Sequence, residues 1–368
     1  MSMLSGLCIK ARKKHGEELR RLALRHNLLD ISRKPRATSS HIFLPINRLP
    51  LEEESAALRR VTAFEIRVCS LSPARLPPKG LLDLLAGVIP AELLTDLPKS
   101  YDIIGDIIVI EDLSESLKSY WEAIGAALLE MCTSARTCLL KSGKVEGERR
   151  IPTYQLLAGI DKTDTAYTEH GVKLKVDLAK AYFSPRLAYE RQRIAAMVNE
   201  GETVVDMFAG VGPFSLTIAK NVGAKVHSID INPDAIALLT ENISSNRLKG
   251  NVYPVCGDAA IVSKELAGIA DHVIMNLPGS SLNFLSAAAA LLKPSGGLIH
   301  IYFFLADPEA DHAASLVKDA LKGHCRQMDI KGVRVVKEVA PKKWQYVADV
   351  ACKVSGHSAK ANSPRRQR

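Results

Sequence analysis

The sequence predicts an α/β fold with a parallel sheet, and four segments in its second half carry that prediction. Residues 204–215 read VVDMFAGVGPFS, an apolar run that ends in Asp206, followed by a turn with two glycines and an apolar helical pattern. Three later apolar runs end in Asp230, Asp258 and Asn276, with helical patterns between them. Strands that alternate with helices form βαβ units and share one parallel sheet. Their polar ends therefore meet at one edge, where ligands bind in such sheets.

The turn after Asp206 has the composition of a binding loop. Gly210 and Gly212 can take backbone conformations that a Cβ atom forbids, and they let a ligand approach closely. The helix that follows offers unpaired N–H groups to an anion. A dinucleotide-binding G-x-G-x-x-G motif would have a third glycine where this chain has Ser215, so the spacing argues against a dehydrogenase. The alternative is a plain α/β domain whose acids only cap strand ends.

Two further acids fit a nucleoside ligand. Asp230 ends the second strand, the position at which an acid accepts hydrogen bonds from ribose hydroxyls in nucleotide-binding βαβ units. Asp258 ends the third strand and is expected near the amino group of an adenine. We expect Asp206 to take part in the same site.

Composition and length fit a chain of two or three globular domains. The 368 residues are 47% hydrophobic and 24% charged, which is typical of a soluble globular protein. No apolar run reaches the ~18 residues of a membrane-spanning helix, and residues 1–6 show no secretory signal. Seven scattered cysteines, never in Cys-x-x-Cys spacing, predict reduced thiols, a cytoplasmic location and no metal.

The charge of the chain indicates a polyanionic partner such as a nucleic acid. The net charge is +9 and the pI is about 9.1. Basic residues cluster between residues 10 and 36, and this cluster is the better candidate for nucleic-acid contact. Another basic group lies in residues 356–368, among Ser, Ala and Pro, where a solvated tail is an equally good interpretation.

Changes in composition divide the chain into five parts. A small basic α/β domain (1–72), a Pro-rich linker (73–80) and an α+β domain (81–180) precede the main domain (181–355) and a basic tail (356–368). In the first domain we expect strands at 4–11, 41–46 and 63–71 and a helix at 15–26. In the second we expect a strand pair at 101–110, a helix at 117–133, and strands at 137–140, 155–158, 163–169 and 172–177. The main domain should end in a hairpin of 333–339 and 346–354.

Together these segments resemble one family, the archaeal and eukaryotic tRNA (guanine-N1)-methyltransferases that modify position 37, next to the anticodon. The resemblance rests on residues 101–107 (YDIIGDI), 176–187 (VDLAKAYFSPRL), 190–191 (ER), 205–214, 230–233 (DINP) and 276–278 (NLP). The N-terminal segment also looks like the family's small first domain. The resemblance implies a Rossmann-like class I methyltransferase domain preceded by two smaller α+β domains. It also implies S-adenosylmethionine as cofactor and tRNA as substrate, and we expect a monomer.

The resemblance also implies roles for particular side chains. Guanine N1 carries a proton at neutral pH, so its methylation needs a base, and the family's glutamate matches Glu190. Negative charge develops on O6 as the proton leaves, and the arginine that balances it matches Arg150, with Arg149 as the open alternative. Asn276 is expected to face the reacting groups. The residues expected to bind the cofactor are Tyr182, Arg191, Asp206, Phe208, Gly210, Gly212, Asp230, Ile231, Asp258, Ala259, Asn276 and Pro278.

Several of these side chains also have a plain structural interpretation. Glu190 opens a predicted helix, where the helix dipole favours an acid. Arg149 and Arg150 can simply be a pair of solvent-exposed arginines without a catalytic role. Tyr182 can pack in the core, and Arg191 can form a structural salt bridge.

Other functions stay open at this point. The nearest is transfer of the 3-amino-3-carboxypropyl group of the same cofactor to the same tRNA position in wyosine synthesis. A bifunctional methyltransferase that also modifies a wyosine intermediate is another. A non-catalytic tRNA-binding protein belongs to a different class, and the intact acids at three strand ends argue against it. In each case the N-terminal basic domain is expected to bind the body of the tRNA.

Overall fold

The computed structural model describes residues 4–72, 80–146, 151–306, 310–340 and 342–354. Arg149, Arg150, the tail 356–368 and all but Gly80 of the linker lie outside the described residues. The chain divides into two compact units, Met1–Leu84 and Leu85–Arg368, which are treated separately below. No helix within the described ranges is long and apolar enough to span a membrane.

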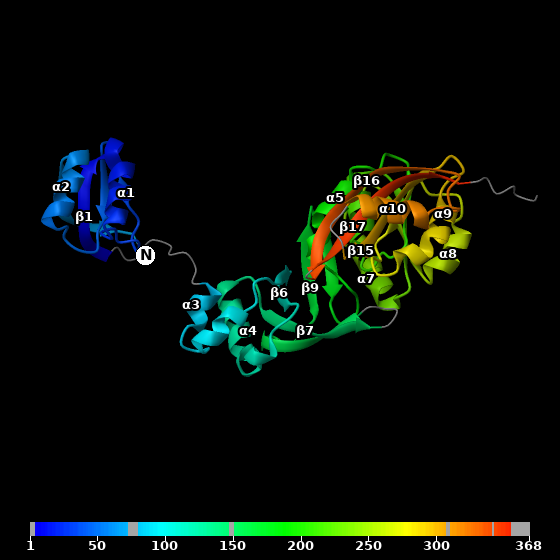
Figure 1. Cartoon of the computed structure of the whole chain (residues 1–368), viewed down its shortest axis with the longest axis horizontal. Helices are drawn as coiled ribbons and strands as arrows, with labels where there is room; N and C mark the ends of the chain where they lie inside the picture. The colour runs from blue at the N-terminus through cyan, green and yellow to red at the C-terminus, as the bar shows by residue number, and fades with distance from the viewer. Residues whose placement is uncertain (1–3, 73–79, 147–150, 307–309, 341, 355–368) are drawn as a thin grey trace, which may run out of the picture. The chain divides into compact units, whose positions relative to one another are not determined.

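The first unit is a four-stranded antiparallel sheet with two helices packed against it (Figure 1). Its strands, in the order β2-β3-β1-β4, are β1 (Leu4–Arg12), β2 (Arg36–Ala37), β3 (His41–Pro45) and β4 (Phe64–Leu71), and its helices are α1 (Gly16–Arg25) and α2 (Glu52–Val61). A short 3₁₀ turn, η1 (Lys13–His15), joins β1 to α1. Sequence reasoning missed α2, which buries only Glu54 and Leu58 and so lacks a long apolar stripe.

The second unit begins with a smaller layer of strands and helices. Its sheet has the order β5-β6-β7-β8, with β5 (Asp102–Ile104), β6 (Ile107–Ile110), β7 (Thr137–Glu146) and β8 (Ile151–Gly159). The helices before and between these strands are η2 (Ala91–Asp96), η3 (Glu115–Tyr120) and α4 (Trp121–Met131). The short helix α3 (Leu81–Leu85) contains the point at which the first unit ends, after Leu84. The β5–β6 turn needs Gly105, whose φ is 59° and where a Cβ would collide with the side chain of Thr165.

The larger part of the second unit is a seven-stranded sheet covered by helices on both faces (Figure 1). The strand order is β13-β12-β11-β14-β15-β17-β16, and only the last two pairings, β15–β17 and β17–β16, are antiparallel. The strands are β11 (Thr203–Asp206), β12 (Lys225–Asp230), β13 (Asn251–Cys256), β14 (His272–Met275), β15 (Gly297–Leu305), β16 (Gln327–Ala340) and β17 (Lys343–Lys353). The predicted α/β class and the C-terminal hairpin are confirmed.

Two groups of helices bury the two faces of this sheet. The helices α5 (Ala188–Ala195), α6 (Pro213–Asn221) and α7 (Pro233–Ser244) pack on one face, and α8 (Ala259–Glu265), α9 (Leu285–Leu291) and α10 (Ala310–Ala320) pack on the other. Burial on both faces explains why the central strands read as continuous apolar runs rather than alternating ones. Short 3₁₀ turns η4 (Pro185–Leu187) and η5 (Ser281–Phe284) precede α5 and α9.

The predicted boundary at residue 180 runs through a shared core. The hairpin of β9 (Asp164–Glu169) and β10 (Val172–Asp177) lies before that boundary, yet its residues Leu174 and Val176 belong to the same hydrophobic cluster as Val204 and Val226 of the large sheet. Ile107 and Leu139 of the smaller layer join the same cluster. The two layers of the second unit are therefore packed together.

Two disulfides correct the prediction of reduced thiols. Cys8 and Cys69 link β1 to β4, and Cys325 and Cys352 link the segment before β16 to β17. The partners are 61 and 27 residues apart, so spacing along the chain gives no sign of them. Free thiols in the described part of the chain are those of Cys132, Cys138 and Cys256.

Candidate functional site

A cavity of about 980 Å³ lies at the carboxyl ends of the parallel strands of the second unit. Its walls include residues that directly follow β11 and β14, the neighbouring strands at which the strand order reverses. Connections leave such a switch point in opposite directions and open a crevice there, which is where ligands bind in sheets of this kind. The cavity is therefore the candidate site.

The glycine turn after β11 forms one wall of the cavity. Gly210 and Gly212 have φ of 55° and 84°, the left-handed region that favours glycine. The Gly210 N–H donates to Asp230 Oδ2 at 2.7 Å, and a Cβ at Gly210 would meet nothing closer than Tyr182 O at 3.7 Å. The space beside Gly210 is thus open to a ligand. Gly212 caps α6, and a Cβ there would collide with Leu239, so Gly212 serves close packing instead.

Asp206 is not among the described residues that line the cavity, and its part in cofactor binding stays a prediction. Its Oδ2 accepts a hydrogen bond from Ser215 Oγ at 2.9 Å, and Ser215 Oγ accepts one from Ser228 Oγ at 2.8 Å. Burial raises the pKa of Asp206 to about 7. The sequence pattern correctly placed Asp206 at the end of a strand, but it could not give the direction of the side chain. The carboxylate points between β11, α6 and β12, where it bonds Ser215.

Asp230 and Asp258 do line the cavity. Asp230 Oδ1 accepts a hydrogen bond from the Asn232 N–H at 2.9 Å, and burial raises its pKa. Asp258 Oδ1 accepts from the Ala260 N–H at 2.8 Å and so caps α8. Each carboxylate is fixed by backbone donors and retains acceptor capacity for a ligand. Their roles toward ribose and adenine stay predictions.

Asn276 follows β14 and presents an unsatisfied acceptor. It lines the cavity, and its Oδ1 is buried without a hydrogen-bond partner among the described residues. Leaving a buried acceptor unpaired costs about 1–3 kcal/mol. The site therefore fits a ligand that donates a hydrogen bond at this position.

The other end of the cavity is lined by charged side chains that sequence reasoning did not single out. Lys141 of β7 bonds Glu111 at 2.8 Å, and both line the cavity. Arg186, within the FSPRL run, also lines it and bonds Asp102 at 2.7 Å. Lys337 of β16 reaches the same end, where burial and then the charge of Arg186 lower its pKa. Glu111, Lys141, Arg186 and Lys337 come from four separate segments of the chain, so only the folded chain brings them together.

Tyr182 and Arg191 differ in how far their predicted roles fit. Tyr182 lines the cavity and is 48% exposed, which excludes the core-packing alternative. Arg191 is buried and bonds both carboxylate oxygens of Glu169 at 2.7 Å and Ser184 O at 2.6 Å. The structural salt bridge considered for Arg191 is thus present. Because Arg191 also lines the cavity, a contact with the cofactor stays a prediction.

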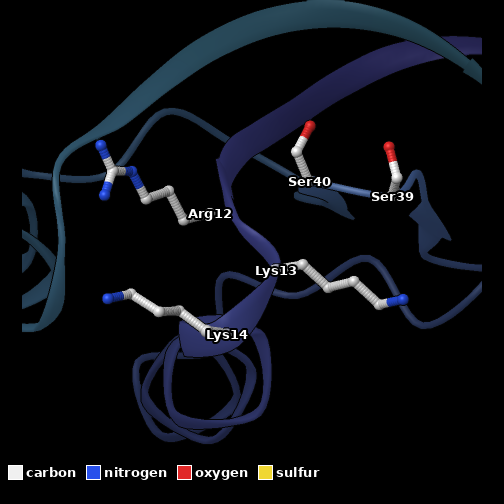
Figure 2. Close-up of a pocket in the computed structure, with 5 residues that line it drawn as sticks. All are labelled: Arg12, Lys13, Lys14, Ser39 and Ser40. Carbon is white, nitrogen blue, oxygen red and sulfur yellow. The ribbon is translucent and has the colours of Figure 1, made fainter.

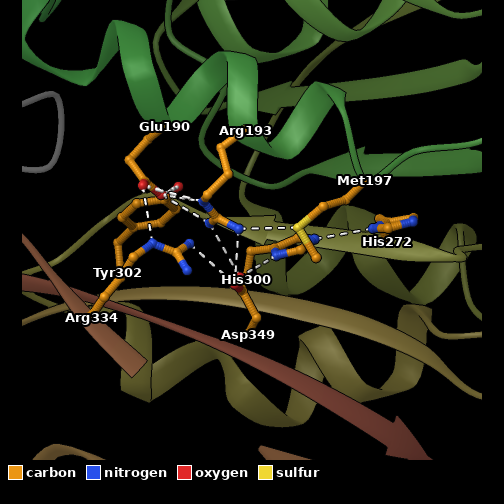
Figure 3. Close-up of polar contacts among 8 residues, drawn as sticks. All are labelled: Glu190, Arg193, Met197, His272, His300, Tyr302, Arg334 and Asp349. Atoms are coloured by element: carbon orange, nitrogen blue, oxygen red, sulfur yellow. Dashed lines mark hydrogen bonds and ion pairs between the residues drawn. The ribbon is translucent and has the colours of Figure 1, made fainter. Parts of the chain in front are cut away.

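Glu190, the predicted base, is not among the described residues that line the cavity. Its carboxylate accepts hydrogen bonds from Arg193 at 2.9 Å, from the Tyr302 hydroxyl at 3.0 Å and from Arg334 Nε at 3.3 Å (Figure 3). Burial raises the pKa of Glu190, but the two guanidinium groups outweigh burial and hold it below the ordinary glutamate range. In this arrangement Glu190 is therefore a poorly basic carboxylate, and its role as the base stays a prediction.

The charge cluster around Glu190 continues into two buried histidines. His300 Nδ1 lies 2.6 Å from Asp349 Oδ1, and His300 Nε2 lies 3.1 Å from His272 Nδ1 (Figure 3). Burial, with His300 as the second cause, lowers the pKa of His272 from 6.5 to about 4. Burial raises the pKa of Asp349, but His300, Arg193 and Arg334 together hold it well below its usual range.

We expect this histidine pair to make the protein acid-sensitive. In the unfolded chain His272 takes up a proton below pH 6.5, whereas in the folded chain it stays neutral down to about pH 4, so stability is lost as the pH falls between these values. The full effect is about 3 kcal/mol, at about 1.4 kcal/mol for each pH unit. Denaturant unfolding at about pH 7 and about pH 4.5 measures it. The raised pKa of Asp206 acts in the opposite direction over the same range, so the contribution of His272 is the difference in pH dependence between the unaltered chain and His272→Asn. Identical pH dependences of the two proteins would contradict it.

The predicted site residues fall into two groups, those that line the cavity and those that do not. Those that line the cavity are Tyr182, Arg191, Phe208, Gly210, Asp230, Ile231, Asp258, Ala259, Asn276 and Pro278. Glu190, Asp206 and Gly212 do not line it, and Arg150 falls outside the described residues. Lining residues that sequence reasoning missed include Glu111, Lys141, Ser184, Arg186, Asn232, Phe284, Lys337 and Gln345.

A second, shallow pocket lies in the first unit. It is lined by Arg12, Lys13, Lys14, Ser39 and Ser40. Figure 2 shows the three basic side chains fanning out from the end of β1. The Lys13 N–H donates to Ser40 O at 2.9 Å, which holds the two segments together. The predicted basic cluster thus includes a compact cationic site.

The strand order, the glycine turn and the strand-end acids define the Rossmann-like fold of the class I methyltransferases, which use S-adenosylmethionine. More particularly, the chain belongs to the TRM5/TYW2 methyltransferase family, whose methyltransferase-domain model matches residues 165–331. The tRNA methyltransferase 5 N-terminal domain matches residues 8–54, and the TYW2 N-terminal domain matches 81–163.

Relatives and solved structures agree with this assignment. The tRNA (guanine(37)-N(1))-methyltransferase Trm5b of Pyrococcus abyssi is 37% identical over 345 residues, 93% of this chain and 98% of that protein. A complex of aTrm5 with tRNALeu is 31% identical with a TM-score of 0.75, over 94% of this chain and 99% of that one. TYW2 of M. jannaschii in complex with AdoMet is 28% identical with a TM-score of 0.53, over 70% and 100%. A tRNA(Phe) (4-demethylwyosine(37)-C(7)) aminocarboxypropyltransferase of Pyrococcus horikoshii is 35% identical over 222 residues, 60% of this chain and 77% of that protein.

Proposed function

We propose that this chain transfers the methyl group of S-adenosylmethionine to N1 of guanosine 37 in tRNA. The observation that carries the proposal is the cavity at the β11–β14 switch point, lined by the strand-end residues Asp230, Asp258 and Asn276, in a chain of the TRM5/TYW2 family. The relatives that match over nearly the whole chain are named for this reaction. The chain is therefore an S-adenosylmethionine-dependent tRNA methyltransferase.

The residues present fit S-adenosylmethionine. The open face of Gly210 gives room for close backbone approach, and Asp230 and Asp258 offer carboxylate oxygens for ribose hydroxyls and the adenine amino group. The buried Oδ1 of Asn276 has no hydrogen-bond donor within the described part of the chain, so a bound cofactor can supply one. When bound, S-adenosylmethionine supplies an electrophilic methyl group with the sulfonium sulfur as its leaving group.

The end of the cavity lined by Glu111, Lys141, Arg186 and Lys337 is called the acceptor end here, because we propose that guanine binds there. Methylation of guanine N1 requires that a proton is removed and that a developing negative charge is balanced. As the bond from N1 to the methyl carbon forms and the carbon–sulfur bond breaks, the N1 proton has to leave, and Glu190 is proposed as its acceptor. Charge then grows on O6, for which Arg150 is proposed as the counter-charge. Arg186 and Lys141 are paired with Asp102 and Glu111, so Lys337 is the cation that gives this end of the cavity its net positive charge among the described residues. That charge attracts the electron-rich edge of a base. Monomeric action of the chain stays a prediction.

Mass spectrometry of a tRNA substrate tests the reaction. A tRNA transcript with guanosine 37, incubated with the chain and S-adenosylmethionine, should gain one methyl group, and nuclease digestion should place it on guanosine 37. A transcript with adenosine 37 is the control and should gain nothing. Gain of an aminocarboxypropyl group would assign the chain to the other branch of the family. If no tRNA gains mass, the chain would be assigned as a non-catalytic tRNA-binding protein.

We also propose that the first unit binds the body of the tRNA through its basic pocket. Lys13→Ala with Lys14→Ala should weaken tRNA binding, and the slope of log affinity against log salt should fall by about 2, one for each lost phosphate contact. Arg59→Ala with Arg60→Ala, exposed on α2 of the same unit, is the matched control with the same change in charge. Unchanged affinity and slope in the lysine variant would assign the pocket another purpose.

A further inference from the structure

Two arginines share two acids in the cluster behind the cavity wall. Arg193 bonds Glu190 at 2.9 Å and Asp349 at 2.9 Å, and Arg334 bonds the same two acids at 3.3 and 3.2 Å (Figure 3). The cluster is therefore neutral in sum, with Glu190 bound on both sides. As long as both arginines stay, its carboxylate is stabilised as an anion and is a weak proton acceptor.

Arg334 is the partner that can leave. Its side chain is 34% exposed, compared with 15% for Arg193, and both of its contacts are longer than those of Arg193. Glu190 and Asp349 are only 4% and 6% exposed, but when Arg334 leaves, Glu190 keeps its hydrogen bonds from Arg193 and Tyr302. Water can solvate the freed guanidinium on its exposed side. Arg193 belongs to α5 together with Glu190 and cannot move independently of it.

The strand that carries Arg334 also forms part of the acceptor end. Arg334 lies on β16, the last strand of the sheet, and Lys337 and Val339 of β16 line the cavity. The pairing of β16 with β17 is irregular between Val335 and Lys337, directly after Arg334. Bulges of this kind bend a strand and re-aim its side chains, and they occur beside active sites. A nucleobase that contacts Lys337 can therefore shift the part of β16 that carries Arg334.

We propose that Arg334 is a positioning residue that locks Glu190 in the free protein, and that a purine at the acceptor end of the cavity opens this pair so that Glu190 reaches the N1 proton. The inference rests on the proposed function and adds a gating step to it. In that step the N1 proton passes to a Glu190 oxygen, the N1 electron pair forms the bond to the methyl carbon, and the carbon–sulfur electron pair stays on sulfur. The charged and titratable groups that face Glu190 are Arg193 from α5, Tyr302 from β15, Arg334 from β16 and, through the arginines, Asp349 from β17.

The kinetic test compares two pH profiles of the full chain with Arg334→Met. The profile of kcat/KM reports the free enzyme, and the single-turnover rate at saturating tRNA reports the complex. In the free enzyme the variant lacks one of two arginines on Glu190, so the acid limb of kcat/KM should move up by about one pH unit. In the complex the pair is already open, so the single-turnover profile should match that of the unaltered chain.

Two variants and one independent measurement complete the test. Lys331→Met removes a charge on the same strand that pairs with the exposed Asp329, and it should shift neither profile. Arg334→Lys keeps a charge and should restore most of the kcat/KM profile. Carboxyl ¹³C titration, with Glu190→Gln to assign the signal, reads the pKa of Glu190 without any turnover. Adding tRNA and S-adenosylhomocysteine should raise that pKa in the unaltered chain to the value of the Arg334→Met variant.

The outcomes separate this inference from the proposed function. Equal shifts of both profiles would mean that Arg334 stays on Glu190 throughout the reaction, which overturns the gating step. No shift in either profile, or no change of the ¹³C titration on adding tRNA, overturns it as well. If the unaltered chain fails to methylate guanosine 37, the proposed function fails, while the titration still decides whether ligand binding opens the pair.

Discussion

Glu190→Gln should lower the single-turnover methylation rate by ~10²–10⁴ at neutral pH, because a glutamine cannot accept the N1 proton and general-base catalysis contributes about that much. Binding of S-adenosylmethionine should survive, since Glu190 is not among the described residues lining the cavity. Binding of tRNA should survive for the same reason. The remaining activity should rise with pH, because guanine N1 then ionises without help.

The buried position of Glu190 makes one control necessary. Its carboxylate receives hydrogen bonds from Arg193, Tyr302 and Arg334, and a glutamine keeps an acceptor oxygen for them but leaves the two arginines with Asp349 as their shared acid. Thermal unfolding of the variant therefore has to accompany the rates. A rate and pH profile like those of the unaltered chain would exclude Glu190 as the base. Loss of cofactor binding together with stability would assign it a structural role.

The parts of the site that could be predicted from sequence are those fixed by local pattern. Asp230, Asp258 and Asn276 each end an apolar run, and parallel strands bring such ends to one edge of the sheet. The cavity at that edge includes all three. The same pattern does not give the direction of the Asp206 side chain, which bonds Ser215 of the next helix, because the last side chain of a strand can point either into a ligand site or into the packing of that helix.

The parts that could not be predicted depend on contacts between distant segments. Lys337 lies more than 150 residues from Ser184, yet their side chains are 3.5 Å apart at the acceptor end. Cys8 and Cys69 are joined only because β1 pairs with β4. Glu190 was matched by its neighbours in the chain, but its state depends on Arg334, 144 residues away, as well as on Arg193 of its own helix. No periodicity or spacing encodes such pairs, so they appear only once the strands have paired.

Arg191→Met should destabilise the second unit by about 3–5 kcal/mol, because it leaves a buried carboxylate without its cation. The Arg191 and Glu169 side chains are 2% and 4% exposed and bond at 2.7 Å, so water cannot replace the lost partner. Denaturant unfolding measures the loss. Arg186→Met is the matched control, since Arg186 pairs with Asp102 at the same distance but is 35% exposed, and its loss should be below about 1 kcal/mol.

The same variant decides whether Arg191 also binds the cofactor. A ligand that binds only the folded state stabilises it in proportion to the logarithm of its concentration over its Kd. Saturating S-adenosylmethionine should therefore raise the stability of Arg191→Met and of the unaltered chain by equal amounts if the salt bridge to Glu169 is the whole role of Arg191. A smaller gain in the variant would show that the guanidinium also holds the cofactor. Replacing both partners, with Glu169→Gln added to Arg191→Met, should recover part of the lost stability, because no charge is then left buried alone. If the single variant is as stable as the unaltered chain, the buried ion pair does not stabilise this unit.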